Sequence, residues 1–558
     1  MPSTHVPSDS RPPATRPRRR ASGVVVLAAA TTLLLFAEAT VRQPAHAAGA
    51  STATARPTIQ PMSANGLFAP DQPVTFAVGA AGTPALADVG WRITDARGVL
   101  VEAGDAVVGS SGRAEIRPTR RLNAGTYRVT AHGPALPETS FRFVRTPGVE
   151  HRDAFFNVTM NGSPGPVAAA LPTLDGLGAA GFRQDLQWST VEKVPGVFDF
   201  RSTDARVDPI VRDRGVAPLF VLDYGHMAYT GGAMTPPDVS DPAQTAAWRR
   251  FVSEAVTHMR DRYPDADRSF EIWNEWTNTH GTRSADPAAY IALSRVTAAT
   301  IRSVDPDARI VGPAENAVSS GELRWLDEWF RLGGADHIDA ISVHPYNQPY
   351  APEHCVATNP CIENALRWLR DKAAKYPRAN GEPLPIWITE VGWPTPNGRP
   401  GWVSEDDQAA FLVRTHVLAA QYGVERVFSF EMAAPDQPDP DGSARTFGLV
   451  DAPSRAYEPK PAAAAYATMQ RQLAGMRFAG QFVTGAVREA RFVSADGTRS
   501  VRVVWQTADR FDELPISVGL PGDGTIVDAY GGTKAVRGTG GKLAMSATWK
   551  PRFVVWNG

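Results

Sequence analysis

SFEIWNEW at residues 269–276 and IWITEVGW at residues 386–393 are the two stretches that decide the fold of this chain. Each is an apolar, strand-like run that delivers a carboxylate, Glu275 or Glu390, between tryptophans. Over about residues 155–473, apolar runs of this kind alternate with amphipathic, helix-like stretches. That alternation is typical of βα units around a parallel sheet.

The number of these units predicts an α/β fold, a closed (β/α)8 TIM barrel. The strand candidates are Phe155–Met160, Phe182–Trp188, Ala217–Tyr224, Ser269–Glu275, Arg309–Ala314, Asp339–Tyr346, Pro385–Gly392 and Val424–Glu431. Helix candidates include Gln244–Arg262, Pro287–Val304, Leu323–Leu332, Ile362–Tyr376, Glu405–Tyr422 and Pro461–Leu473. Eight strands, each followed by a helix, are what such a barrel needs. A doubly wound open sheet is the alternative, but no Gly-rich phosphate-binding fingerprint follows the first strand.

Short alternating stretches, punctuated by Gly, Pro and Asp, lie on both sides of the βα region. Examples are Val74–Val78 and Gly125–Val129 before it, and Val501–Trp505 and Phe553–Trp556 after it. This pattern predicts an N-terminal Ig-like β-sandwich and a C-terminal small β-sandwich. The expected division of the chain is a signal peptide at 1–47, a linker and β-sandwich at 48–148, the barrel at 149–475 and a β-sandwich at 476–558.

The N-terminus has the features of an export signal. Four arginines between Arg16 and Arg20 precede an apolar run from Gly23 to Ala37, and a small-residue stretch ends in Ala45-His46-Ala47. This pattern predicts cleavage after Ala47 and a secreted, extracellular protein, with the general and twin-arginine routes both open. A membrane anchor is the alternative, but the run is shorter than the roughly 18 apolar residues of a spanning helix. We therefore expect no membrane span after signal cleavage.

The charge balance of the exported chain bears on its partners. Without the six basic and two acidic residues of 1–47, it holds 51 basic and 56 acidic side chains, a net charge of −5. No Lys/Arg-rich block remains, which disfavours a nucleic-acid partner. A neutral substrate fits this balance better.

The two cysteines, Cys355 and Cys361, close the short loop CVATNPC. In an exported protein we expect them to form a disulfide. A metal site is the weaker alternative, because two thiols do not complete a tetrahedral shell. We assign no metal site and no cofactor, and the sequence leaves the oligomeric state open.

The two glutamates are the main candidates for chemistry. Active sites of (β/α)8 barrels lie at the C-terminal strand ends, which is where Glu275 on strand four and Glu390 on strand seven are expected. Two carboxylates that face each other across the barrel mouth can split a glycosidic bond. One, protonated, gives its proton to the leaving oxygen, while the other, ionised, attacks the anomeric carbon. Plain ion pairs with strand-end arginines are the structural alternative.

These motifs resemble those of clan A glycoside hydrolases. Asn274-Glu275 at the end of strand four and Glu390 at the end of strand seven carry the resemblance to the clan. The stretch GFRQDLQWSTVEKVPGVFDF (Gly181–Phe200), with His344-Pro345-Tyr346 and Glu390–Trp393, resembles glycoside hydrolase family 39 and related bacterial exopolysaccharide hydrolases. The resemblance covers the whole predicted barrel.

The resemblance implies a role for each residue that carries it. Glu275 becomes the general acid/base, Glu390 the nucleophile, and Asn274 the group that holds the hydroxyl next to the anomeric carbon. Arg183, on strand two, is implied to keep Glu390 ionised, since an opposite charge within about 4–6 Å lowers a carboxyl pKa. Strict alternation would send Asn274 and Glu275 to opposite faces. We therefore expect the chain to leave regular strand geometry there, for example by a bulge.

Further candidates lie at the strand ends. His344 and Tyr346 share one face of strand six by period two, where they are expected to line the sugar subsite and position Glu390. Their alternative is a polar plug in the barrel interior, although such interiors favour branched aliphatic residues. Trp393 is assigned to substrate binding as a flat face for sugar rings, and Trp188 and Tyr224 are assigned to binding with loop anchoring as an equal alternative. Asp223, His226, Glu315 and Asn316 suit either binding or loop anchoring.

Taken together, these features predict a secreted retaining glycoside hydrolase. Its substrate is expected to be a polysaccharide or glycoconjugate whose O-glycosidic bonds are cleaved by double displacement. A transglycosylase, in which another sugar intercepts the covalent intermediate, would use the same site. A surface carbohydrate-binding protein without catalysis is the alternative from another class, but Glu275, Glu390 and Asn274 are all present.

Overall fold

The computed structural model describes residues 58–79, 89–109, 113–134, 136–162, 164–279, 285–357, 359–378, 380–395, 402–436 and 446–558. The predicted signal peptide at 1–47 and the linker before residue 58 lie outside these ranges. Within them, we find no helix that combines the length and the apolar character needed to span a bilayer.

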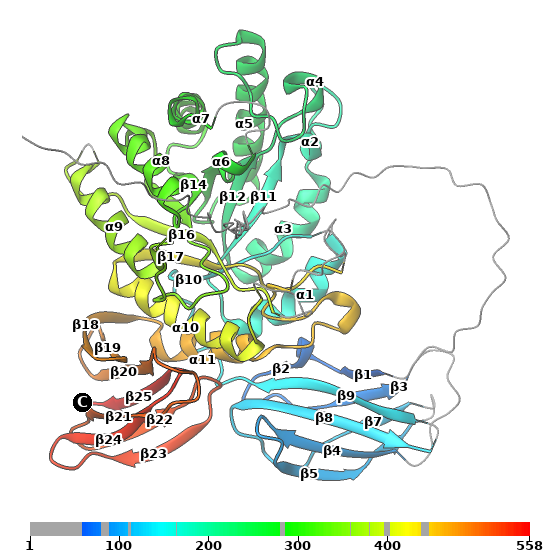
Figure 1. Cartoon of the computed structure of the whole chain (residues 1–558). Coiled ribbons are helices and arrows are strands. Elements are labelled where there is room, and N and C mark those ends of the chain that lie inside the picture. Colours follow the sequence, from blue (N-terminus) through cyan, green and yellow to red (C-terminus); the bar gives the residue numbers. More distant parts are fainter. Residues whose placement is uncertain are drawn as a thin grey trace, which may run out of the picture.

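Eight parallel strands close into a barrel, which confirms the predicted fold of this part of the chain (Figure 1). Around the barrel they are β10 (Phe156–Thr159), β11 (Gly181–Gln187), β12 (Ala217–Asp223), β13 (Ser269–Ile272), β14 (Arg309–Asn316), β15 (Ala340–His344), β16 (Ile386–Val391) and β17 (Val424–Ser429). β17 pairs with β10 and so closes the ring. Each strand begins and ends within three residues of its predicted bounds.

Helices cover the outside of the barrel (Figure 1). They are α1 (Pro164–Leu177), α3 (Arg201–Arg214), α5 (Pro242–Arg262), α7 (Pro287–Val304), α8 (Ser320–Arg331), α9 (Cys361–Lys375), α10 (Glu405–Gln421) and α11 (Pro461–Leu473), with short α2 (Trp188–Val191), α4 (Met227–Thr230) and α6 (Trp276–Thr279) in the connections. Local chemistry fixes their starts. Asp286 accepts the Ala288 N–H before α7, and Ser319 with Glu322 forms a capping box at α8.

The barrel interior changes from apolar to polar toward the C-terminal strand ends. Its apolar part is a buried cluster of Leu219, Val311, Ala340, Trp387 and Phe428. Two residues after Ala340 and Trp387, and thus on the same strand faces, come Ser342 and Thr389, both buried. The barrel therefore has an apolar floor beneath a polar, buried mouth.

Two sheets precede the barrel in the sequence and pack through a shared core that includes Phe68, Phe76 and Phe143. One sheet has the order β1-β3-β7-β6 and the other the order β2-β9-β8-β4-β5. Their strands are β1 (Thr58–Pro61), β2 (Leu67–Phe68), β3 (Phe76–Gly79), β4 (Gly90–Asp95), β5 (Leu100–Asp105), β6 (Val107–Val108), β7 (Ala114–Ile116), β8 (Gly125–Gly133) and β9 (Leu136–Arg145). The Ig-like topology of this region stays a prediction.

Two further sheets follow the barrel. A six-stranded sheet has the order β18-β19-β20-β25-β22-β23, and a two-stranded sheet joins β21 to β24. Their strands are β18 (Met476–Thr484), β19 (Val487–Ser494), β20 (Arg499–Gln506), β21 (Leu514–Gly519), β22 (Asp523–Val527), β23 (Thr533–Arg537), β24 (Lys542–Ala547) and β25 (Arg552–Asn557). Val504, Val518 and Val554 lie in a core that both sheets share.

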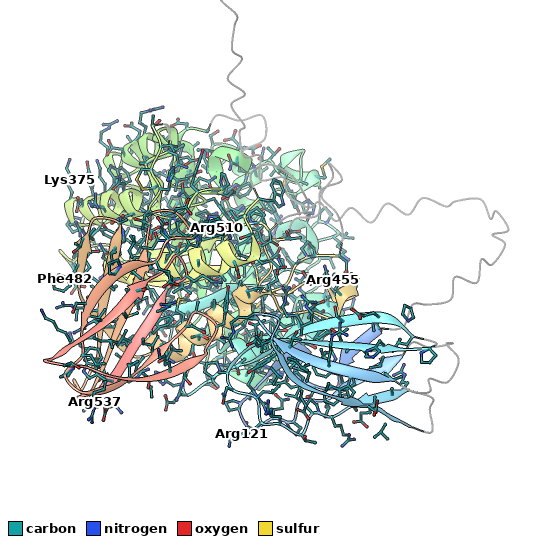
Figure 2. All side chains as sticks on the ribbon, turned by 60° about the horizontal axis from the view of Figure 1, so that its bottom comes forward. Arg121, Lys375, Arg455, Phe482, Arg510 and Arg537 are labelled. Atoms are coloured by element: carbon teal, nitrogen blue, oxygen red, sulfur yellow. A yellow bond between two sulfur atoms is a disulfide. The ribbon has the colours of Figure 1, made fainter. Side chains whose placement is uncertain are left out.

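The acidic first turn of α10 contacts both β regions, which lie on the α10 and α11 side of the barrel (Figure 1). Arg142 of β9 pairs with Glu405. From the C-terminal region, the Tyr530 hydroxyl donates to Asp406 at 2.5 Å, and Arg510 donates to Asp407 at 3.1 Å. Arg510 is labelled in Figure 2. Acidic groups at a helix N-terminus also interact favourably with the helix dipole. The first turn of α10 therefore connects the barrel with both the N-terminal and the C-terminal β regions.

A buried ion pair joins α10 to the loop that follows β15, and the C-terminal region contacts the same pair. Glu353 in that loop pairs with Arg414 of α10 at 2.5 Å, and both side chains are almost completely buried. The indole N–H of Trp505, on β20, donates to the same carboxylate at 2.8 Å. The loop after β15 is thus held from both sides.

Breaking this buried pair should destabilise the protein strongly. Arg414→Met leaves the Glu353 carboxylate buried without its cation, so we expect a loss of about 3–5 kcal/mol in the free energy of unfolding. Arg331→Met, which breaks the exposed pair with Glu328, is the control and should cost at most about 1 kcal/mol. Urea unfolding followed by tryptophan fluorescence measures both. Equal losses would show that the Glu353 pair contributes no more than an exposed one.

Candidate active site

The turn after β13 brings Glu275 over the barrel mouth. Trp273 and Glu275 have positive φ values of 64° and 45°, so the chain leaves strand geometry as predicted. It does so through left-handed residues, whereas the bulge lies in the neighbouring strand β14, between Pro313 and Glu315. The Glu275 N–H donates to the carbonyl of Ala314 at 3.1 Å. Non-glycine residues in this conformation are strained and cluster at functional sites.

Arg183 on β11 connects three groups of the site. Its Nε donates to Glu271 at 2.7 Å, its Nη1 to Glu390 at 2.5 Å and its Nη2 to the Asn274 side-chain oxygen at 2.8 Å. Arg183 and Glu271 are both buried, so each needs the other's charge. The sequence predicted the contact of Arg183 with Glu390 but neither its contact with Asn274 nor its contact with Glu271. A glutamate within the apolar run SFEIW (residues 269–273) was the sequence feature that could have indicated a buried partner for Arg183.

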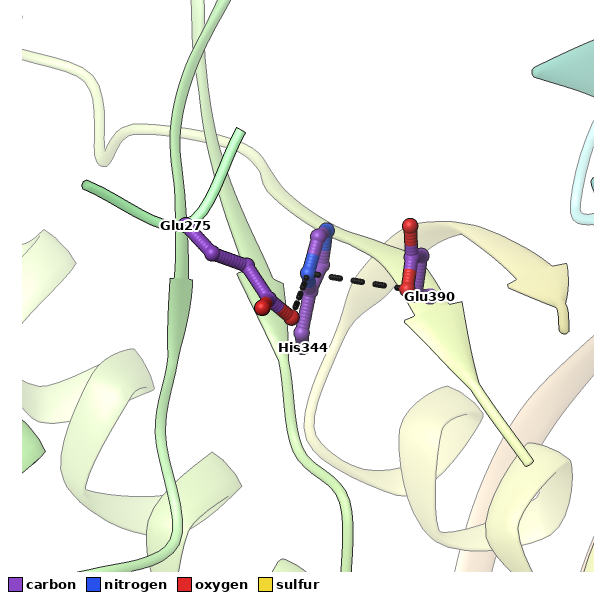
Figure 3. A group of neighbouring side chains, drawn as sticks. All are labelled: Glu275, His344 and Glu390. Carbon is purple, nitrogen blue, oxygen red and sulfur yellow. Dashed lines mark hydrogen bonds and ion pairs between the residues drawn. The ribbon is translucent and has the colours of Figure 1, made fainter. Parts of the chain in front are cut away.

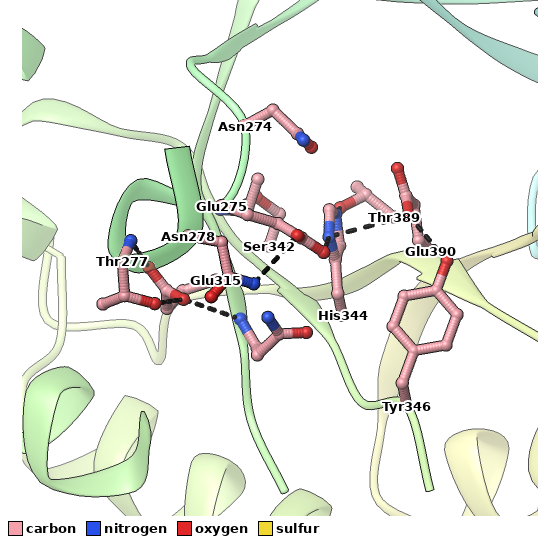
Figure 4. Close-up of polar contacts among 12 residues, drawn as sticks. Asn274, Glu275, Thr277, Asn278, Glu315, Ser342, His344, Tyr346, Thr389 and Glu390 are labelled. Atoms are coloured by element: carbon pink, nitrogen blue, oxygen red, sulfur yellow. Dashed lines mark hydrogen bonds and ion pairs between the residues drawn. The ribbon is translucent and has the colours of Figure 1, made fainter. Parts of the chain in front are cut away.

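The two glutamates have different partners. Glu390 Oε2 accepts the Tyr346 hydroxyl at 2.6 Å, while Oε1 accepts Arg183. Glu275 Oε1 lies 2.9 Å from His344 Nδ1, and its Oε2 accepts the Asn278 amide at 3.1 Å. His344 lies between the two carboxylates, 3.8 Å from Glu390 (Figure 3). Its other nitrogen is 3.1 Å from the Thr389 hydroxyl, which orients the ring (Figure 4).

The two carboxyl groups are close together. One carboxylate oxygen from each glutamate and a nitrogen of His344 all lie within 4.8 Å of one another. Retaining glycosidases place their carboxyl groups about 5–5.5 Å apart, and inverting ones about 6.5–9.5 Å apart. A limit of 4.8 Å between two carboxylate oxygens fits the shorter spacing of retaining enzymes.

Because they are so close, these three groups titrate together. Burial alone would lower the pKa of His344, but the charges of Glu390 and Glu275 raise it above its ordinary value. Burial alone would raise the pKa of Glu275, but the hydrogen bond with His344 brings it below its ordinary value. Burial raises the pKa of Glu390, against the charges of His344 and Arg183. The ligand-free site therefore favours a proton on His344, directed at Glu275.

Tyr224 joins the site, whereas two predicted tryptophans lie elsewhere. The Asn274 amide donates to the Tyr224 hydroxyl at 3.1 Å. Trp188 is fully buried, with its ring stacked on Phe251 of α5. Trp393 is also buried, packs on Phe411 of α10 and donates its indole N–H to the carbonyl of Tyr350. The assignment of these two tryptophans to substrate binding is therefore corrected, because both are buried in the core between strands and helices.

The predicted disulfide is present. Cys355 and Cys361 are bonded in the connection between β15 and α9, with their Cα atoms 4.5 Å apart. The other group of potential metal ligands in the described ranges is Glu275, His344 and Glu390. Because the Arg183 guanidinium already contacts Glu390, we expect these three side chains to share a proton and not to bind a metal cation.

Comparison with known proteins agrees with this geometry. The family model described as glycosyl hydrolases family 39 matches residues 175–445, which include both glutamates. Most of the barrel is therefore similar to clan A glycoside hydrolases, and in particular to family 39. A β-xylosidase of Caldicellulosiruptor saccharolyticus is 25% identical over 228 residues, which are 39% of this chain and 45% of that protein. A β-xylosidase of Geobacillus stearothermophilus is 28% identical over 158 residues, 27% of this chain and 31% of that protein.

The match therefore spans less than half the length of either curated relative. A solved structure of a family 39 glycoside hydrolase from Bacteroides cellulosilyticus WH2 is similar over more of the chain. It aligns with 89% of this chain and 100% of its own, with a TM-score of 0.73 and 22% identity. At that identity the similarity shows a shared fold.

The electrostatics of the site predict a change that can be measured without substrate. Glu275→Gln should lower the pKa of His344, because it removes one of the charges that raise it. Nitrogen NMR of histidine-labelled protein measures this pKa, with His344→Asn to assign the signal. Asp204→Asn, which alters the partner of His258 on the barrel exterior, should leave His344 unchanged. An unaltered His344 pKa in Glu275→Gln would refute the proton arrangement described above.

Proposed function

We propose that the protein is a secreted retaining glycoside hydrolase that cleaves O-glycosidic bonds of a carbohydrate, with Glu390 as nucleophile and Glu275 as general acid/base. The observation that carries the proposal is the close approach of the two carboxyl groups, each with its own partners. The family match and the β-xylosidase relatives support it. Secretion rests on the N-terminal sequence.

The first step forms a covalent intermediate. Glu390, held by Arg183 and Tyr346, attacks the anomeric carbon, and the bond to the leaving oxygen breaks. Glu275 gives that oxygen a proton, which His344 holds 2.9 Å from Glu275 in the ligand-free site. Asn274, fixed between Arg183 and Tyr224, is placed to bind the adjacent hydroxyl. A general acid positioned in this way typically raises the reaction rate by about 10²–10⁴-fold.

The second step releases the sugar. Glu275, now ionised, takes a proton from water, and the water oxygen displaces Glu390 from the anomeric carbon. This second inversion restores the original configuration, which the product therefore retains. A transglycosylase would differ only in using a sugar hydroxyl in place of water. A purely carbohydrate-binding protein would not require two glutamates with such different partners.

The charge of the site favours a neutral sugar over an acidic one. Around Arg183 lie not only Glu271 and Glu390 but also Asp185 and Asp223, whose charges act on one another. Asp223 is fully buried, and neither of its carboxyl oxygens has a hydrogen-bond partner in the described part of the chain. Burial and Asp185 raise the pKa of Asp223 well above its usual range. Surroundings that keep the Asp223 carboxyl protonated would equally disfavour the carboxylate of a uronate.

Mutation of the two glutamates tests the mechanism. Glu390→Ala should abolish turnover of every substrate, because no other group forms the covalent intermediate. Glu275→Ala should still release an activated leaving group and then stall, since no base activates water. Azide should restore turnover of Glu275→Ala with a product of retained configuration. If azide instead rescues Glu390→Ala with retention, the two roles are reversed.

Substrate charge is tested with a matched pair of glycosides. Nitrophenyl β-glucoside and nitrophenyl β-glucuronide differ chiefly in one carboxylate, so their ratio isolates the electrostatic effect. We expect kcat/KM for the glucuronide to be at least about tenfold lower, because like charges in a buried site repel. Nitrophenyl β-xyloside, the neutral sugar named by the relatives, serves as reference. Equal hydrolysis of glucoside and glucuronide would refute the preference for neutral sugars.

A further inference from the structure

Glu315, near the end of β14, is fully buried close to Glu275 and is not part of the mechanism above. Its Oε1 accepts the Thr277 hydroxyl at 2.5 Å and the Asn316 N–H at 3.1 Å, and its Oε2 accepts the Thr277 N–H at 3.0 Å (Figure 4). A carboxylate with donors on both oxygens is fixed in place. Glu315 therefore ties α6, which begins one residue after Glu275, to β14.

The α6 turn in turn fixes Glu275. Asn278 donates its side-chain amide to Glu275 Oε2 at 3.1 Å and its backbone N–H to the Glu275 carbonyl at 2.9 Å. On the other side, the Glu275 N–H donates to Ala314, the residue before Glu315. Ala314 itself has a positive φ of 55°. The two residues with positive φ, Glu275 and Ala314, are therefore hydrogen-bonded to each other directly beside Glu315.

The charge of Glu315 also acts on Glu275. Among the described residues, the titratable groups that act on Glu315 are Glu275, from the turn after β13, and Tyr290, from α7. Burial, opposed by the Thr277 hydrogen bonds and reinforced by the charge of Glu275, raises the pKa of Glu315 to about 7. Repulsion between two carboxylates is mutual. Above about pH 7 the negative charge of an ionised Glu315 therefore favours retention of the proton that Glu275 and His344 share.

We propose that Glu315 is a positioning residue for the general acid: it anchors the α6 turn that orients Glu275, and its negative charge opposes loss of the proton that Glu275 and His344 share. This inference rests on the proposed function. It adds a third glutamate, one that touches no substrate, to the machinery for proton donation. The charge extends activity toward alkaline pH, where a lone acid would already have lost its proton.

Two variants separate the anchor from the charge. Glu315→Gln removes the charge but keeps an acceptor for Thr277, whereas Thr277→Val removes one donor and keeps the charge. Glu322→Gln is the control, because Glu322 accepts backbone N–H groups of the same β14–α8 connection without contacting α6. Each is assayed across pH on a glycoside with a poor leaving group and on one with an activated leaving group. Thermal unfolding checks that each variant folds.

With the poor leaving group, Glu315→Gln should move the alkaline limb of kcat/KM to lower pH by about half a unit to one unit. Thr277→Val should lower kcat/KM about 10-fold or more without moving that limb to lower pH. With the activated leaving group both effects should largely vanish. Glu322→Gln should change neither quantity.

An unmoved alkaline limb in a folded Glu315→Gln would overturn the proposal, as would equal losses on both substrates. Rescue of Glu275→Ala by azide distinguishes this failure from failure of the proposed function. If rescue occurs and the limb stays, the hydrolase mechanism stands and only the role of Glu315 falls. If the wild-type protein hydrolyses no glycoside, both proposals fall.

Discussion

The three-way contact of the Arg183 guanidinium with Glu271, Glu390 and Asn274 is the interaction on which the rest of the site depends. A buried cation is costly unless its charge and its hydrogen-bond donors are matched. The burial that would lower the pKa of Arg183 is outweighed by Glu271 and Glu390, and the pKa lies well above its ordinary value. The permanent charge then fixes the position of the carboxylate that attacks and of the amide that binds the neighbouring hydroxyl. Strand β11 thereby sets the geometry of β13 and β16.

A polar barrel mouth of this kind needs a rigid frame. Trp273, Glu275 and Ala314 all adopt left-handed backbone conformations, each of which costs about 1–3 kcal/mol at a non-glycine residue. Hydrogen bonds to neighbouring strands hold them, from the Trp273 N–H to Leu222 and from the Glu275 N–H to Ala314. The apolar floor around Trp387 and the surrounding helices supply the packing that keeps these contacts in register. Side chains that strict alternation would separate are thereby brought to one face.

The sequence predicted the barrel well because its signals are local. Apolar runs and caps such as Asp286 depend on neighbours in the chain, so strand and helix bounds could be placed closely. Glu275 and Glu390 stood out because a carboxylate ended an apolar strand. Glu271 and Glu315 were missed or left ambiguous, since their partners come from other strands or from a turn that no periodicity describes. Trp188 and Trp393 were misplaced because a tryptophan beside a strand end serves a core as well as a sugar.

The β regions bear on the site through the same barrel frame. The acidic turn that contacts both of them is followed at once by Gln408, whose amide donates to the carbonyls of Trp393 and Phe447 at 2.9 Å each. Trp393 lies three residues after Glu390, so the contact reaches the segment that carries the nucleophile. Glu353, held by Arg414 and Trp505, lies in the loop after β15, the strand whose end supplies His344 and Tyr346. Contacts of this kind argue that the C-terminal sheets belong to the structural unit that orients Glu390, since their removal would expose Glu353 and leave the loop after β15 supported from one side only.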